Sequence, residues 1–213
     1  MEELFTSDQN TNWLHEKYYA AGANHRYFTF QLVLNLLTQY RKFQEDDDDL
    51  VIVETGCQRQ EDDLGAGMST SIFAEWASRH GGQVISVDNW EPHLLVCEQC
   101  IQPWKDRVRL VLCDSVSFLQ GYRGPVDLLY LDSLDYPVGE NAEDPVATFA
   151  AQQHCLNEFR AIEDRLSEHC VVMSDDNQLP GGGKPKLLKP YLAQRGYLCL
   201  LDFQQTVWVK KLK

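Results

Sequence analysis

Short apolar segments alternate with helical segments through most of this chain, and no other feature constrains its fold as much. Five apolar runs follow one another: Leu50 to Glu54, Val84 to Val87, Val108 to Leu112, Val126 to Leu131 and Cys170 to Met173. Segments with helical character separate them: Ser69 to Arg79, Pro92 to Ile101, Ser115 to Gln120 and Ala147 to Leu166. Near-continuous apolar strands that alternate with helices predict a parallel sheet covered on both faces.

The two ends of the chain depart from this alternation. Asn12 to Phe43 carries apolar residues at helical spacing and predicts two helices, and the five acids Glu45 to Asp49 follow as a solvated linker. Near the C-terminus, a predicted helix, Pro185 to Gln194, precedes two short strands, Tyr197 to Leu201 and Val207 to Lys211. The gap between these strands is too short for a helical crossover, so we expect them to pair antiparallel.

The composition limits the number of domains and the kinds of partner. The 213 residues are 44% hydrophobic, which suits one main domain of residues 50–213 with the N-terminal helices and linker of residues 1–49 packed on it. The formal net charge of -13 would repel phosphate backbones and anionic membranes, so we expect a small-molecule partner and neither nucleic acid nor membrane. A homodimer is left open. The N-terminus lacks a basic and apolar leader, and no apolar run reaches about 18 residues, so we expect a cytoplasmic protein.

The end of the first strand carries groups that suit a bound cofactor. Ligands of an open parallel sheet lie beyond the carboxyl ends of its strands. This strand end and the next helix start carry Glu54, Gly56, Cys57, Gly67 and Ser69. The glycines would let the backbone approach a ligand, and Ser69 or Thr70 could cap the helix. The intervening loop, Gln58 to Leu64, is acidic and would repel a pyrophosphate, but it suits a cofactor with a sulfonium and an amino group.

Acids also follow the second and third strands. Asp88 ends the second strand, where a carboxylate can accept hydrogen bonds from both hydroxyls of a ribose. Asn89 and Trp90 come next, and Trp90 could pack on an adenine. After the third strand, Asp114 could accept from the adenine amine and Ser115 could cap the next helix.

In this order, the segments Val51 to Gly56, Val84 to Asn89, Val108 to Ser115 and Val126 to Asp132 resemble the successive motifs of class I S-adenosylmethionine-dependent methyltransferases. The resemblance covers Leu50 to the C-terminus. It implies a Rossmann-like α/β fold, doubly wound and mostly parallel, with a C-terminal antiparallel hairpin, and S-adenosylmethionine as cofactor. The implied contacts are Glu54, Gly56, Asp88, Asp114 and Ser115, and the full predicted set adds Cys57, Gly67, Ser69, Asn89, Trp90 and Asp132.

The fourth and fifth strand ends predict the site of chemistry. Asp132 ends the fourth strand, and Asp175, Asp176 and Asn177 follow the fifth. Oxygen ligands of this kind suit Mg²⁺ or Ca²⁺. The arrangement resembles catechol-type O-methyltransferases, which implies Asp132, Asp176 and Asn177 as metal ligands. Asp135 departs from that pattern, because the catechol type has a lysine base there. The segment Leu131 to Tyr136 more closely resembles a broad bacterial group of uncharacterised methyltransferases, many of which act on small or sugar-like hydroxyls. Without a metal, Asp132 would contact the cofactor and Asp176 and Asn177 would form a turn.

Three further side chains are candidates for catalysis. His154 and Glu158 are four residues apart on a predicted helix, so a carboxylate could orient an imidazole base. The alternative is an ordinary solvated pair. The run Gly181 to Lys184 fails the phosphate-loop pattern and instead predicts a mobile loop that brings Lys184 near the substrate.

These features together predict an S-adenosylmethionine-dependent methyltransferase that acts on a small-molecule hydroxyl, with help from a divalent cation as an open option. One alternative is a cofactor-binding protein of the same fold without turnover, which the missing lysine favours. A second is a nicotinamide-dependent oxidoreductase.

Overall fold

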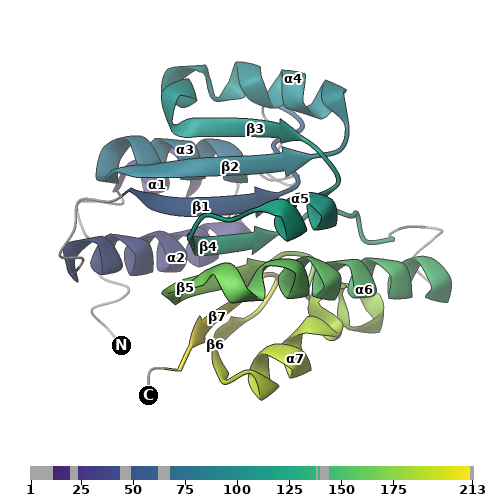
Figure 1. Cartoon of the computed structure of the whole chain (residues 1–213). Helices are drawn as coiled ribbons and strands as arrows, with labels where there is room; N and C mark the ends of the chain where they lie inside the picture. The colour runs from purple at the N-terminus through teal and green to yellow at the C-terminus, as the bar shows by residue number, and fades with distance from the viewer. Residues whose placement is uncertain are drawn as a thin grey trace.

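The computed structural model describes residues 12–19, 24–43, 49–61, 68–137, 139 and 144–211. The strands among these residues form one seven-stranded sheet with the order β3-β2-β1-β4-β5-β7-β6 (Figure 1). Strands β1 to β5 pair in parallel, and β7 pairs antiparallel with β5 and β6. The strands are β1 (Leu50–Thr55), β2 (Gly82–Asp88), β3 (Val108–Leu112), β4 (Val126–Leu131), β5 (Leu166–Ser174), β6 (Tyr197–Asp202) and β7 (Thr206–Lys210). The predicted mostly parallel sheet with a C-terminal antiparallel hairpin is therefore confirmed.

The strand order reverses between β1 and β4, and the described helices cover both faces of the sheet. Figure 1 shows α2 and α3 behind the sheet and α5, α6 and α7 in front of it. The helices are α1 (Asn12–Leu14), which continues as a π-helical turn (His15–Tyr19), α2 (Asn24–Phe43), α3 (Ser69–His80), α4 (Glu91–Cys100), α5 (Ser115–Gly121), α6 (Pro145–Ile162) and α7 (Leu188–Gln194). A reversal of this kind opens a crevice at the carboxyl ends of the strands, which is where such sheets bind ligands.

Alternate side chains along each strand divide the core into two layers. Ile52 and Tyr130 pack with Phe73 of α3 on one face. Val53 packs with Phe159 of α6 on the other. All five side chains are fully buried, and burial of a large apolar side chain stabilises a fold by about 1.5 to 3 kcal/mol. The central strands are therefore held from both sides, which fixes the positions of their carboxyl ends.

Two predicted helices have other boundaries in the structure. The predicted helix Ala147 to Leu166 ends at Ile162, and a short 3-10 turn leads into β5 at Leu166. Glu168 and His169 are exposed at the start of β5, so its first residues lack an apolar strand pattern. The predicted helix Pro185 to Gln194 is split into a 3-10 turn, Lys184–Lys186, and α7.

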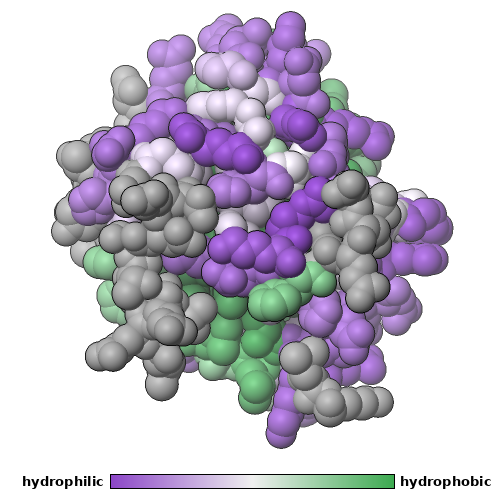
Figure 2. Space-filling model, turned by 90° about the vertical axis from the view of Figure 1, so that its left-hand side faces the viewer, coloured by the Kyte–Doolittle hydropathy of each residue, from purple (hydrophilic) through white to green (hydrophobic). Residues whose placement is uncertain are grey.

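The N-terminal helices share the core of the sheet. Leu14, Tyr18 and Leu34 belong to the same buried cluster as Ile52 of β1. The side of the molecule at which the parallel strands begin is mainly hydrophilic, with a hydrophobic area low in the view, at the height of β5 and the β6–β7 hairpin (Figures 1 and 2). Among the described residues, no helix is long and apolar enough to cross a membrane. Residues 45–48 of the predicted linker lie outside the described part of the chain.

Candidate functional site

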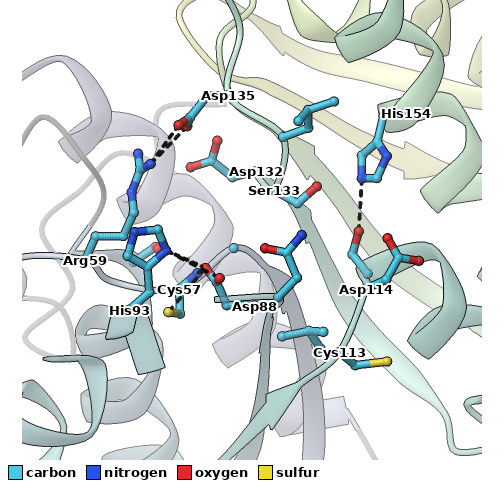
Figure 3. Close-up of a pocket in the computed structure, with 16 residues that line it drawn as sticks. Cys57, Arg59, Asp88, His93, Cys113, Asp114, Asp132, Ser133, Asp135 and His154 are labelled. Carbon is cyan, nitrogen blue, oxygen red and sulfur yellow. Dashed lines mark hydrogen bonds and ion pairs between the residues drawn. The ribbon is translucent and has the colours of Figure 1, made fainter. Parts of the chain in front are cut away.

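A pocket of about 240 Å³ opens at the carboxyl ends of β1 to β4, beside the point where the strand order reverses. Side chains that follow these strands and side chains of the neighbouring helices surround it (Figure 3). Its lining contains eight predicted site residues, in addition to His154: Gly56, Cys57, Ser69, Asp88, Asn89, Asp114, Ser115 and Asp132. Predicted Gly67 lies outside the described residues. The structure therefore brings most of the predicted cofactor-binding residues together around one pocket, and several of these side chains have structural contacts that the sequence did not predict.

Gly56 is required by the close approach of two strands. Its φ of 83° lies in the left-handed region, which favours glycine. A Cβ at this position would collide with the carbonyl oxygen of Asp132. The Gly56 amide donates to the Val87 carbonyl at 2.8 Å. The glycine was predicted to let the backbone approach a ligand, and the structure shows that it lets β1 approach the loop after β4.

Asp88 is held in a defined orientation at the pocket wall. Its Oδ1 accepts from the amide of Trp90 at 2.8 Å, and its Oδ2 lies 3.4 Å from the amide of Cys57 and 3.3 Å from His93 Nδ1. The Asp88 side chain is 10% exposed, and it reaches the open space between the strand ends (Figure 3). Backbone donors fix the carboxylate while it still faces the pocket, as a sugar-binding acid requires.

Glu54 lies behind the pocket instead of in its lining. The side chain is fully buried, and its Oε2 accepts from Thr70 Oγ1 at 2.6 Å and from Ser86 Oγ at 2.7 Å. Burial raises the pKa of Glu54 to about 7, although hydrogen bonds from Ser69, Thr70 and Ser86 oppose the rise. Thr70 Oγ1 also accepts from the amide of Gln58 at 3.0 Å. Glu54 thus connects β1, β2 and the start of α3, a supporting role that its motif position did not reveal.

Three predicted roles differ from the structure: that of Trp90 beside the adenine, and those of two helix caps. Trp90 does not line the pocket, because its side chain is 57% exposed and packs edge-on against His93, with ring centroids 4.4 Å apart. Neither Ser69 nor Thr70 caps α3, whose N-cap position is Met68. Asp114, not Ser115, caps α5 by accepting from the amide of Ser117 at 2.8 Å. The hydrogen bonds from Ser117 lower the pKa of Asp114.

His154 lies at the far side of the pocket with two partners. Its Nε2 is 3.0 Å from Ser115 Oγ and 3.5 Å from Glu158 Oε1. Glu158 is fully buried and accepts from Ser133 Oγ at 2.7 Å. The interaction with Glu158 raises the pKa of His154, against the opposing effect of burial. The pair predicted from its spacing therefore forms, with the imidazole open to the pocket and the carboxylate behind it.

The acids after β4 and β5 converge, but a lysine ammonium joins them. Lys184 Nζ lies 2.9 Å from Asp132 Oδ1 and 3.2 Å from Asp176 Oδ2. The Lys184 side chain is 2% exposed, whereas the two carboxylates are 26% and 25% exposed. Burial opposes the charge on Lys184, but the two carboxylates outweigh it and raise its pKa. Lys184 was predicted to lie on a mobile loop near the substrate, but its side chain is buried behind Asp132 and does not line the pocket.

The predicted metal ligand set does not fit a divalent ion. The third ligand, Asn177, is turned away: its Nδ2 donates to Asp202 and to the Phe203 carbonyl, and its Oδ1 accepts from Lys189 Nζ at 3.0 Å. Among the described residues, no group of three histidine, cysteine or acidic side chains could hold a metal. An ammonium group cannot coordinate a cation. The Mg²⁺ or Ca²⁺ site expected at Asp132, Asp176 and Asn177 was therefore a misreading of these residues.

Asp175 is the centre of a buried network that the sequence did not reveal. Arg26 of α2 binds it through Nε at 2.8 Å and a terminal nitrogen at 3.0 Å. Tyr130 donates to Asp175 Oδ2 at 2.6 Å, and Gln205 donates to the same oxygen at 2.9 Å. Tyr130 Oη also lies 3.3 Å from Asp132 Oδ2. Burial, Asp175 and Asp176 raise the pKa of Asp132 to about 7, although the Lys184 ammonium opposes the rise.

Several lining residues were missed because the signal for them is not local. These residues are Arg59, Val87, His93, Cys113, Ser133, Leu134 and Asp135. Arg59 and Asp135 form an ion pair at 2.9 Å that connects the loop after β1 with the loop after β4 (Figure 3). Asp135 was noted only as a departure from a family pattern. His93 comes five residues after Asp88, and its helical position within reach of that acid could have identified it.

Comparisons with known proteins agree with this fold. A family model described as a methyltransferase domain matches residues 63–177, more than half of the chain. No curated protein sequence matches it.

Among solved structures, the chain is similar to an rRNA methylase from Streptococcus thermophilus, with 16% identity, a TM-score of 0.52 and coverage of 86% of this chain and 96% of that one. It is similar to an SAH-bound methyltransferase from Podospora anserina, with 13% identity, a TM-score of 0.56 and coverage of 96% and 87%. It is also similar to a proposed caffeoyl-CoA O-methyltransferase from Staphylococcus aureus, with 13% identity, a TM-score of 0.56 and coverage of 96% and 100%. At these identities the likeness shows a shared fold.

Proposed function

The chain belongs to the methyltransferase domain family, and from this premise we propose that it transfers a methyl group from S-adenosylmethionine to a hydroxyl of a small molecule. The observation that carries the proposal is the pocket at the reversal point of the sheet, with an oriented Asp88 in its wall. An SAH-bound methyltransferase of the same fold supports the choice of cofactor.

The residues of the pocket fit the chemical groups of this cofactor. Asp88 can accept hydrogen bonds from two ribose hydroxyls, and Asn89 and Asp114 lie where polar contacts to the adenine are expected. The lining carries four acids, Asp88, Asp114, Asp132 and Asp135, against the single arginine Arg59. An acidic lining favours a sulfonium and an ammonium group over a pyrophosphate. This balance also argues against the nicotinamide alternative.

His154 is the proposed general base. When bound, the cofactor supplies an electrophilic methyl group. The His154 imidazole accepts the hydroxyl proton of the substrate while the substrate oxygen bonds to the methyl carbon and the carbon–sulfur bond breaks. Glu158, buried behind the ring, stabilises the imidazolium that forms. Asp132 and Ser133 lie between Asp88 and His154, where the methyl group and the substrate oxygen would meet (Figure 3).

A nucleic-acid substrate is the main competitor. We predicted that nucleic acid is not a partner, and the comparisons do not support that exclusion, since an rRNA methylase shares the fold. The net charge of -13 still favours a small molecule, because a phosphate backbone would be repelled by most of the surface.

Transfer of a labelled methyl group from S-adenosylmethionine tests the proposal. Pools of phenols, sugars and carboxylic acids are incubated with the protein, and rRNA is supplied in a parallel reaction. We expect label in a hydroxyl-bearing pool and an equal amount of demethylated cofactor, both lost with Asp88→Ala. Label in rRNA alone would refute the small-molecule substrate. Cofactor binding without transfer to any pool would favour the protein without turnover.

A further inference from the structure

The ammonium group of Lys184 lies between the carboxylates of Asp132 and Asp176. Its ammonium nitrogen is 2.9 Å from Asp132 and 3.2 Å from Asp176, and the side chain is 2% exposed. Two carboxylates this close repel each other unless a positive charge lies between them. A lysine is the only cationic group that contacts both of these acids in the described part of the chain.

The backbone around Lys184 is shaped to hold it there. Gly181, Gly182 and Gly183 all have φ values in the left-handed region, at 74°, 96° and 66°. A Cβ at Gly183 would collide with the carbonyl oxygens of Asp176 and Asn177, so only glycine allows the loop to fold back onto the end of β5. The Lys184 amide then donates to the Asp176 carbonyl at 3.0 Å.

Asp176 has an unfavourable backbone conformation. Its φ of 56° is positive, which no other described residue except glycine shows. Such a conformation costs roughly 1 to 3 kcal/mol and persists only where the surroundings impose it. The residue with this conformation is also the second acid that contacts Lys184, with Oδ2 3.2 Å from the ammonium nitrogen.

The charges of the whole cluster are close to balance. Three acids, Asp132, Asp175 and Asp176, face two cations, Lys184 and Arg26. Removal of the Lys184 charge would leave two acids near each other with no cation between them, which is the setting in which oxygen-binding divalent ions are bound.

We propose that Lys184 is a permanent internal cation that closes a latent divalent-cation site formed by Asp132 and Asp176. It acts as a positioning residue, because it fixes Asp132 at the pocket wall without itself lining the pocket. The wild-type protein then needs no metal, whereas loss of the lysine creates a site for one. This inference rests on the cluster alone and does not depend on the substrate.

The thermal transition of Lys184→Ala, measured with Mg²⁺ or Ca²⁺ and with EDTA, tests the proposal. At an ion concentration about ten times the dissociation constant, we expect the Tm of Lys184→Ala to rise by about 3 to 6 °C. The wild-type Tm should not rise. Lys189→Ala is the matched control, because Lys189 pairs with Asp202 on the neighbouring hairpin, and its Tm should not respond either. Adding Asp176→Asn to Lys184→Ala should abolish the gain.

The other outcomes of these measurements also decide for or against the proposal. An unchanged Tm of Lys184→Ala with either ion overturns it. So does binding of Mn²⁺ to the wild type, detected by electron paramagnetic resonance and lost in Asp132→Asn. If Lys184→Ala folds only when Mg²⁺ or Ca²⁺ is added, the ion replaces the lysine as proposed. If Lys184→Ala fails to fold at every ion concentration, Lys184→Met, which keeps most of the buried aliphatic chain, replaces it in the same titration, and an unchanged Tm of that variant with either ion overturns the proposal.

Discussion

The two halves of the carboxyl edge of the sheet carry similar acids but use them differently. At the ends of β2 and β3, Asp88 and Asp114 are bound mainly by backbone amides and line the pocket. At the end of β5, Asp175 is enclosed by Arg26, Tyr130 and Gln205 and is 1% exposed. In the first half the carboxylates face an open pocket, and in the second half the carboxylate is neutralised by buried partners.

This difference shows that an acid at a strand end is not evidence of a ligand by itself. The carboxylate becomes a binding group only where its partners leave part of it facing open space. Asp132 lies at the border, because it lines the pocket and also contacts Lys184. The predicted metal site failed at this border, where a lysine from a distant loop supplies the positive charge.

The largest expected effect is on turnover in the open half. We expect His154→Gln to lower kcat by roughly 10² to 10⁴-fold, the usual contribution of a positioned general base. The His154 ring lies at the far side of the pocket from Asp88, where the substrate is proposed to bind, so the affinity for the cofactor should change little. Steady-state kinetics and calorimetry on the same sample separate the two effects. An unchanged kcat would remove His154 from the mechanism and with it the role of Glu158.

The next effect is on the stability of the enclosed half. Arg26→Met should lower the free energy of unfolding by about 3 to 5 kcal/mol, because it leaves the buried Asp175 charge without its main partner. Arg107→Met is the control, since its pair with Asp49 is more than a third exposed on both sides, and it should cost at most about 1 kcal/mol. Urea denaturation measures both. Equal losses would mean that the enclosed half is no more dependent on its charges than the surface.

A pH profile distinguishes a base from a structural histidine. The hydrogen-bonded Glu158 raises the pKa of His154, and a base must be neutral to act, so activity rises as the pH passes that pKa. Glu158→Gln removes the raising effect. The acid limb of kcat/KM should therefore move to lower pH in this variant. A limb that stays in place, or moves to higher pH, would show that another group controls the profile.

The smallest effect concerns the ion pair over the pocket. Arg59 and Asp135 are 34% and 71% exposed, and a pair of this kind is worth about 0 to 1 kcal/mol. Arg59→Ala should accordingly change the free energy of unfolding by no more than that, as measured in urea. A loss of several kcal/mol would show that this exposed pair contributes as much to stability as the buried pair of Arg26 and Asp175, which would contradict the difference between the two halves.

The sequence predicted the fold well because the signals for it are local. The alternation of apolar runs and helices follows from which faces of each element are buried, and the short gap before Val207 requires an antiparallel pair. The weak points were segments such as the start of β5, where exposed polar residues precede the apolar run. The local sequence pattern indicates which residues are buried. It therefore does not identify the part of a strand that extends beyond the core.

The sequence predicted which acids lie near one another at the pocket, but not which side chains they contact. Strand ends meet at one edge of the sheet, so topology alone predicts that Asp88, Asp114 and Asp132 lie around one pocket. Arg26 and Asp175 are 149 residues apart, and Lys184 and Asp132 are 52 apart. No spacing rule connects such pairs, because only the packing of α2 and of the Gly181 to Gly183 loop brings them together.

Isothermal titration with S-adenosylmethionine and its demethylated product tests the central claim most directly. We expect the wild type to bind both with micromolar or tighter affinity. Asp88→Ala, which removes the oriented carboxylate from the pocket wall, should weaken binding by about 10²-fold or more through loss of two charge-assisted hydrogen bonds. Asp106→Ala, at an exposed acid away from the pocket, should bind as the wild type does. No heat with either compound, or equal affinity of the wild type and Asp88→Ala, would contradict the account.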